Sequence, residues 1–193
     1  MQPFRKHTGK VAPLYRANVD TDQIIPKQFL KRVEKTGFGE FLFYDWFRDG
    51  EIELGPNPIL VAGPNFGSGS SREHAVWALA DYGFEAVIAP SFSDIFSGNA
   101  FKNGILTVVL PQEAIDRLME VAIDHPISID LENQTVTTPF QDRFTFEIDP
   151  FRKHCLLNGL DEVGLTLARQ DAIGSFEAQA RAERPFLASG VPA

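Results

Sequence analysis

Residues 59–75, with the sequence ILVAGPNFGSGSSREHA, decide how this chain folds. The run begins with four apolar residues that stop at Gly63-Pro64, which is typical of a strand buried on both faces. From Arg72 to Tyr82 the apolar residues recur at helical spacing, and Gly83 is suited to end a helix. The sequence therefore predicts a buried strand, a glycine-rich loop and a helix in direct succession.

The same alternation extends to either side. Short apolar runs predict further strands at 86–89 and 105–110, helical spacing lies between them at 92–101, and Pro111 begins an amphipathic helix. Toward the N-terminus, residues 11–15 predict another short strand. Strands that alternate with helices indicate parallel crossovers, so we expect an α/β fold with a parallel core sheet.

The pattern changes after the amphipathic helix. Residues 127–131 and 135–138 alternate like a hairpin, and residues 144–148 predict a further strand. Asp149-Pro150 is typical of a capped helix start, and the chain keeps a helical character through Arg184. We therefore expect an additional antiparallel part, followed by helices.

Length and composition fit one globular domain. The chain has 193 residues, of which 44% are hydrophobic and 23% charged, and these globular averages exclude a disordered chain. No repeat, low-complexity tract or linker marks a boundary, so we expect a single domain over residues 1–193, with a flexible tail at roughly 185–193.

Charge and cysteine content exclude several classes of protein. The 18 Lys and Arg against 26 Asp and Glu give a net charge of −8, which is unlike a general nucleic-acid binder. No apolar run approaches the roughly 18 to 20 residues of a membrane span, and the N-terminus lacks the pattern of a secretory signal. Cys155 is the only cysteine, which excludes an intrachain disulfide and favours the reducing cytoplasm.

An aromatic segment spans residues 38–47. A packed core is one interpretation, and an exposed contact with another chain is a second. The aromatic side chains concerned are Phe38, Phe41, Phe43, Tyr44, Trp46 and Phe47.

The loop at residues 63–72 is the strongest candidate for a binding site. It follows a buried strand, and ligands of open α/β sheets bind beyond the carboxyl ends of the strands. Ser70 and Ser71 stand at the predicted helix start, where free N–H groups and the helix dipole favour an anion. Arg72 adds a planar, two-pronged donor for a carboxylate or phosphate. The loop therefore predicts a pocket for a small polyanion.

Common motifs do not account for this loop. A Walker A loop needs a lysine that is missing here, and Arg72 stands where a dinucleotide-binding loop needs its third glycine. No GxSxG elbow surrounds Ser70, and we interpret His74, one turn further along, as a structural histidine. What remains is a serine hydroxyl placed among backbone amides and a guanidinium. The electrostatic field of these groups lowers the free-energy cost of forming a serine alkoxide, and such an alkoxide takes a proton from carbon.

Two separated motifs resemble a known family. Residues 67–75, GSGSSREHA, resemble the signature of the C-terminal, mobile domain of the aconitase superfamily, and residues 18–26, NVDTDQIIP, resemble its opening motif. From the first strand to LDEVGLTL at 160–167, the chain is similar to the small subunits of bacterial 3-isopropylmalate dehydratases. The resemblance implies a swivelling β/β/α domain.

The resemblance also implies an activity shared between two chains. Such enzymes of leucine biosynthesis dehydrate 2-isopropylmalate to bound isopropylmaleate and rehydrate it to 3-isopropylmalate. A 4Fe-4S cluster on the partner, the large subunit, acts as Lewis acid on the leaving hydroxyl. Because this chain has one cysteine, we expect no metal on it, and we expect a large iron–sulfur subunit and a hydroxy-diacid as its partners.

The resemblance further implies roles for residues that match the motifs. Ser70 matches the serine that abstracts and returns the proton. Ser71 and Arg72 match residues that hold a substrate carboxylate and stabilise the alkoxide. Asp20 and Asp22 belong to the opening motif, where we expect them to position Arg72 or the loop; a turn that merely caps a helix is the alternative.

Substrate choice in the family depends on the loop after the opening motif, here residues 26–31. Leu30 suits an isopropyl group, Lys31 is basic, and a plain core role for Leu30 is the alternative. An apolar contact separates substrates by only about 1 to 3 kcal/mol, so homoaconitase and citramalate-type small subunits stay open as alternatives. Alternatives from other classes are a non-catalytic carboxylate-binding module and a self-sufficient hydrolase. The expected supporting residues are Thr21, Asn65, Gly67 and Gly69.

Overall fold

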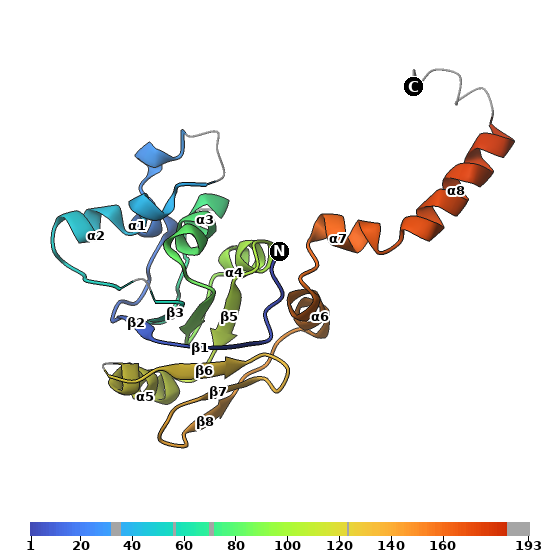
Figure 1. The fold of residues 1–193 in the computed structure, drawn as a ribbon. Coiled ribbons are helices and arrows are strands. Elements are labelled where there is room, and N and C mark those ends of the chain that lie inside the picture. Colours follow the sequence, from blue (N-terminus) through green and yellow to red (C-terminus); the bar gives the residue numbers. More distant parts are fainter. Residues whose placement is uncertain (32–35, 56, 70–71, 123, 185–193) are drawn as a thin grey trace.

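The computed structural model describes residues 1–31, 36–55, 57–69, 72–122 and 124–184. This part of the chain holds two four-stranded sheets, one parallel and one antiparallel (Figure 1). The parallel sheet has the order β2 (Val11–Leu14), β3 (Ile59–Ala62), β4 (Ala86–Ala89) and β5 (Leu106–Val109). The antiparallel sheet has the order β1 (Lys6–Gly9), β6 (Ile127–Asp130), β7 (Thr135–Thr137) and β8 (Arg143–Thr145).

The parallel sheet forms because its central strands are apolar at every position. All four residues of β3 and all four of β4 are buried, which confirms the strands predicted at 59–62 and 86–89. Both faces of a parallel sheet are covered, so its strands are apolar throughout instead of alternating. The register pairs Ile59 with Ala86, and Ala86 in turn with Leu106.

Helices cover the two faces of the parallel sheet. Leu60 and Val87 face a hydrophobic core that includes the inner residues of two helices, whereas Ile59 and Ile88 face a second core shared with a third helix and the antiparallel sheet. The first two helices are α3 (Glu73–Tyr82) and α4 (Asp94–Lys102), and the third is α5 (Gln112–Ala122).

The antiparallel sheet confirms the predicted hairpin and adds a strand that the sequence did not indicate. β6 and β7 correspond to the predicted strands at 127–131 and 135–138, and β8 begins at Arg143, close to the predicted third strand. The added strand β1 pairs with β6, Lys6 opposite Asp130. β1 is polar and partly exposed along its length, which explains why its sequence does not look like a strand.

A helical excursion lies between β2 and β3. Its elements are α1 (Thr21–Ile24), the 3-10 turns η1 (Lys27–Phe29) and η2 (Gly39–Phe41), and α2 (Tyr44–Arg48).

The aromatic segment at 38–47 belongs to the core under this excursion. Phe38 and Phe43 are fully buried, and Phe41, Trp46 and Phe47 are half-buried against the same core. These aromatics are therefore not exposed as the second interpretation expected, because the excursion folds them against α3 and the parallel sheet; contact of the half-buried ones with another chain stays a prediction.

The described part of the chain ends in helices, as predicted through Arg184. α6 (Pro150–Asn158) begins at the Asp149 cap and ends at Gly159, and it is followed by α7 (Glu162–Leu167) and α8 (Gln170–Glu183). α8 extends away from the rest of the molecule (Figure 1). The tail expected to be flexible, 185–193, lies outside the described residues. Within the part that is described, no helix is both long and apolar enough to cross a membrane.

Gly63, directly after β3, allows two strand ends to approach closely. A Cβ added there would lie 2.5 Å from the backbone carbonyl oxygen of Arg16. We expect Gly63→Ala to lower the free energy of unfolding by about 2 kcal/mol, because the backbones must separate. Urea unfolding measures this. The matched control is Gly174→Ala on α8, where a Cβ meets nothing within 4 Å and the change should stay below about 1 kcal/mol. Equal effects of the two substitutions would contradict the prediction.

Candidate active site

The loops after β2 and β3 run side by side, since the carboxyl ends of neighbouring parallel strands meet at one edge of the sheet. The N–H of Gly63 donates to the carbonyl of Arg16 over 3.1 Å, and the N–H of Asn18 donates to the carbonyl of Pro64 over 2.8 Å. The segments that lead into the two sequence motifs are therefore in direct backbone contact, although more than forty residues separate them in the chain.

Further along, backbone hydrogen bonds join the two motifs into a seam. The carbonyl of Val19 accepts from the N–H of Gly67 at 2.8 Å and from the N–H of Ser68 at 3.2 Å. The N–H of Thr21 then donates to the carbonyl of Ser68 over 3.0 Å, and Asp20 and Ser68 form a parallel bridge. We call these contacts between residues 18–21 and 63–68 the motif seam.

Asn65 links the seam to the loop after the next strand, β4. Its side-chain amide donates to Oδ1 of Asn18 at 2.9 Å, and its N–H donates to Oγ of Ser91 at 2.8 Å. Both asparagines have a positive φ, a conformation that asparagine tolerates better than most residues. Asn65 was expected from the sequence, whereas Asn18 and Ser91 were not singled out as site residues. For Ser91, the available signal is its place shortly after a buried strand.

The two loop glycines fit their positions for different reasons. Gly67 has φ +75°, and a Cβ there would lie 2.2 Å from Cγ of Phe96, so both conformation and space require glycine. Gly69 has φ +88°, but an added Cβ would lie 3.5 Å from Cβ of Asp20, an ordinary contact. At Gly69, conformation alone therefore favours glycine. Both expected glycines thus adopt the positive φ that favours glycine.

The acidic residues of the opening motif have separate roles. Oδ1 of Asp20 accepts from the N–H of Gln23 at 2.8 Å, and the Gln23 side chain accepts from the N–H of Asp20, which forms a capping box for α1. Asp20 thus matches the helix-capping alternative. Asp22, in the first turn of α1, instead contacts Arg72. Thr21 is buried between them.

The ion pair between Asp22 and Arg72 is the central polar contact of the described site. Nη1 of Arg72 donates to Oδ1 of Asp22, so a side chain of the opening motif holds the arginine of the second motif. The Arg72 side chain is only 18% exposed, whereas that of Asp22 is 54% exposed. Arg72 occupies the N-cap position of α3 in an extended conformation. Of the two acidic residues predicted to position Arg72, the structure assigns this contact to Asp22.

The structure describes neither of two predicted site residues, and it tests only part of the prediction for a third. Ser70 and Ser71 lie outside the described residues. Leu30 follows η1 and is half-buried against the hydrophobic core that α3 covers. Its predicted place beside the substrate stays a prediction.

His74 has the environment of a structural histidine. Its ring lies 4.6 Å from the ring of Trp77 and 5.4 Å from that of Phe38, centroid to centroid. Burial is the main cause that lowers the pKa of His74 below its ordinary value of 6.5; the charge of Arg72 also lowers it, and that of Glu73 opposes this. The neutral ring is therefore favoured at neutral pH, mainly because burial disfavours the charged form.

The described residues do not fit an iron–sulfur cluster. Among them there is no group of three or more His, Cys, Asp or Glu side chains that could hold a metal ion. Cys155 is buried in α6, and burial raises the pKa of its thiol, which disfavours the thiolate that ligates metals.

Family models cover nearly the whole chain. The aconitase C-terminal domain matches residues 1–58 and 50–113. The LeuD_N model matches residues 116–150, and the C-terminal domain of the 3-isopropylmalate dehydratase small subunit matches residues 162–189.

Three relatives that match nearly the whole chain share one name. The 3-isopropylmalate dehydratase small subunit of Novosphingobium aromaticivorans is 65% identical over 100% of this chain and 98% of its own length. The small subunit of Erythrobacter litoralis is 58% identical over 98% of each chain, and that of Zymomonas mobilis is 56% identical over 93% of this chain and 96% of its own.

A solved structure agrees with the sequence relatives. The crystal structure of a 3-isopropylmalate dehydratase from Methanocaldococcus jannaschii superposes with a TM-score of 0.69 and 26% identity, covering 89% of this chain and 99% of that one. The predicted α/β class, with a parallel sheet and a separate antiparallel part, is thereby confirmed. With matching models along its length and close relatives over its full extent, this chain belongs to the family of 3-isopropylmalate dehydratase small subunits.

Proposed function

We propose that this chain is the small subunit of a hydro-lyase that interconverts 2-isopropylmalate and 3-isopropylmalate through isopropylmaleate in leucine biosynthesis. The names of the full-length relatives support the reaction. The observation that carries the proposal is the contact of Asp22 with Arg72 across the motif seam, because it brings the two motifs of the aconitase resemblance into one site.

Arg72 is proposed to bind a substrate carboxylate. A guanidinium has five N–H donors, so its contact with Asp22 through Nη1 leaves further donors for a ligand. The low exposure of Arg72 strengthens a charge-assisted hydrogen bond, because less water competes for the donors. Asp22 would restrict the orientation of the guanidinium before the substrate arrives, which lowers the entropy lost on binding.

Ser70 is proposed to carry out the proton transfer. As an alkoxide, its Oγ would take the proton from the substrate carbon next to the hydroxyl-bearing carbon. The electron pair of the broken C–H bond forms the C=C bond of isopropylmaleate as the hydroxyl leaves. On rehydration, water adds with the opposite regiochemistry and Ser70 returns its proton. Ser71 would assist Arg72 at the carboxylate, and Leu30 would contact the isopropyl group.

A large subunit is implied by the small-subunit designation of the relatives, and we propose that it holds the 4Fe-4S cluster of the enzyme. This chain contributes one cysteine, whereas such clusters are held by several thiolates. When bound there, the cluster would supply Lewis-acid chemistry at the leaving hydroxyl. We place the complex in the cytoplasm, which suits the unpaired Cys155.

Ser70→Ala tests the proposed function. Mixed anaerobically with its large subunit, the wild-type chain should turn over 2-isopropylmalate, whereas the chain alone should not. Ser70→Ala should lower kcat by at least about 10²-fold, because general-base catalysis contributes that much or more. Its affinity for the large subunit should not change. Ser128→Ala on β6, whose hydroxyl contacts Thr8, serves as a matched control and should retain full activity. A fully active isolated chain, or an active Ser70→Ala complex, would exclude the proposal.

Arg72→Lys tests carboxylate binding. An ammonium cannot make the two-pronged contact, so we expect kcat/KM to fall about 10- to 100-fold, the loss of a charge-assisted hydrogen bond of about 1.5 to 3 kcal/mol. Steady-state kinetics of the complex measure this. Arg143→Lys at the start of β8, an exposed position, is the control. Unchanged kinetics in Arg72→Lys would mean that Arg72 is structural.

Asp22→Asn tests whether Asp22 positions Arg72. We expect KM to rise about 3- to 10-fold with little change in kcat, since a pair with one exposed partner contributes about 1 kcal/mol. The double variant with Arg72→Lys should lose little beyond Arg72→Lys alone, because the two residues act through one contact. Fully additive losses would show that Asp22 acts independently of Arg72.

A further inference from the structure

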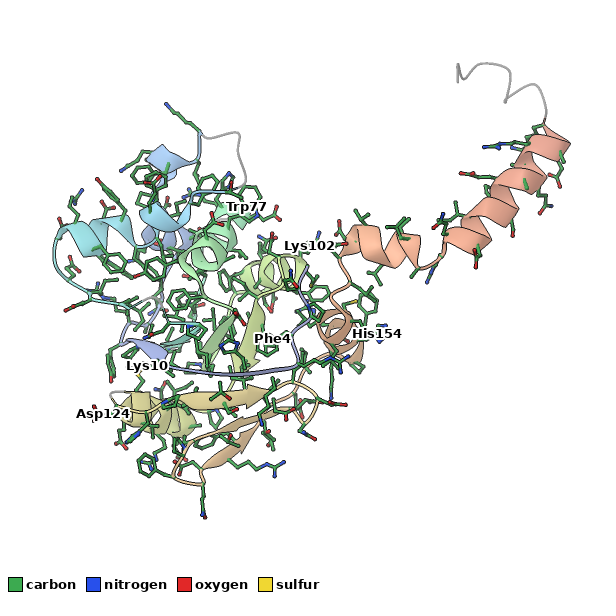
Figure 2. The ribbon with its side chains drawn as sticks, in the orientation of Figure 1. Phe4, Lys10, Trp77, Lys102, Asp124 and His154 are labelled. Atoms are coloured by element: carbon green, nitrogen blue, oxygen red, sulfur yellow. The ribbon has the colours of Figure 1, made fainter. Side chains whose placement is uncertain are left out.

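The C-terminal arm, which we define as residues 162–184, stands apart from the two cores. It comprises α7 and α8, and α8 extends away from the remaining elements (Figure 1). Every residue from Thr166 to Gln179 is exposed. Side chains along α8 point into open space on all sides in the stick view (Figure 2). A helix of this length is marginal in water without tertiary contacts, so its stability calls for a partner surface.

The arm carries an apolar stripe. On α8, Ile173, Phe176 and Ala180 follow one another at spacings of three and four residues, which places them on one face. Phe176 is 72% exposed and Ile173 is 40% exposed. On α7, Val163 and Leu167 are spaced four residues apart and are also exposed. An exposed row of large apolar side chains on a protruding helix is typical of a surface that binds another protein.

The base of the arm is fixed to the body. Oδ1 of Asp161 accepts from the N–H of Gly164 at 2.8 Å and caps α7, while Oδ2 pairs with the N-terminal ammonium at 3.1 Å. These contacts lower the pKa of Asp161, the Gly164 amide being the largest cause. Lys102, at the end of α4 and labelled in Figure 2, pairs with Glu162 at 3.0 Å. The arm therefore begins at a defined place, unlike a loose tail.

The polar side of the arm argues against a polyanionic partner. Acidic and basic side chains are interspersed there, so no single-sign patch forms that would attract a nucleic acid or a membrane surface. The charged residues of the arm beyond α7 are Arg169, Asp171, Glu177, Arg181, Glu183 and Arg184. The apolar stripe thus favours a protein partner with an apolar groove.

The family matches favour the large subunit over a second copy of this chain. The arm coincides with the match to the C-terminal domain of the 3-isopropylmalate dehydratase small subunit at 162–189, whereas the aconitase C-terminal domain matches only within 1–113. The arm thus belongs to the part of the chain that distinguishes small subunits.

We propose that the C-terminal arm docks its apolar stripe into an apolar groove of the large subunit. The inference rests on the proposed two-chain enzyme for the identity of the partner. Ile173 and Phe176 are the anchors, because a buried aromatic and its aliphatic neighbour dominate helix-in-groove contacts.

A pair of matched double variants tests the docking. Ile173→Gln with Phe176→Gln removes the stripe without changing the net charge, and Gly174→Gln with Ala178→Gln places the same side chains on the opposite face of α8. All four positions are exposed, so neither variant disturbs a core. Binding of each full-length chain to the separately purified large subunit is measured by biolayer interferometry under anaerobic conditions. We expect the stripe variant to bind at least about 100-fold more weakly and the control to bind as the wild type does.

Limited trypsin digestion gives a second readout, independent of activity. Arg169 and Arg181 are exposed in the arm and should be cleaved quickly in the free chain. Added large subunit should slow cleavage at Arg181 at least about tenfold in the wild type and the control, and much less in the stripe variant.

The outcomes separate the arm from the proposed function. Wild-type-like binding of the stripe variant would overturn the docking proposal, as would equal weakening of both variants. The docking proposal would also be overturned if the stripe variant changes only the self-association of this chain, measured by analytical ultracentrifugation. That result would show that a second copy of this chain covers the stripe. In each of these cases the wild-type complex still turns over 2-isopropylmalate. If the wild-type chain neither binds the large subunit nor supports turnover, the proposed function itself fails.

Discussion

The motif seam is the contact on which the candidate site depends. One carbonyl, that of Val19, accepts the N–H groups of both Gly67 and Ser68, and the N–H of Thr21 returns a hydrogen bond to Ser68. These bonds fix the register between two motifs that the chain order separates. The approach of Arg72 to Asp22 follows from that register, because each lies within a few residues of the seam. A shift of one residue would place both side chains differently.

The sequence alone predicted the parts of the fold that are buried on both faces. The strands at 59–62 and 86–89 have uninterrupted apolar residues because helices or the second sheet cover each face, and that pattern has few other interpretations. β1 could not be predicted, since its polar residues are held by pairing with β6, a partner over a hundred residues away. The aromatic segment around Phe38 was ambiguous for a related reason, because composition does not tell an inner from an outer face.

For the site, the sequence predicted which residues take part more readily than which of them contact each other. The positive φ angles of Gly67 and Gly69 follow from a glycine-rich loop between a strand and a helix. The sequence offered helix capping as an alternative for both acids but did not separate Asp20, which caps α1, from Asp22, which contacts Arg72, because that contact depends on the tertiary approach of the two motifs. Ser91 was not predicted because its role comes from the adjacency of β3 and β4, a tertiary property.

The position of the arm suits a site shared between two chains. The motif seam lies at the ends of β2 and β3, whereas the arm begins after α6, at a base held by Asp161 and Lys102. If the arm supplies much of the association energy, the loops of the site, which must face the large subunit, need not supply it. They stay able to adjust when substrate enters, while the complex remains assembled. The affinity between the subunits and the catalytic geometry then depend on different residues, because the docking surface lies apart from the residues that react.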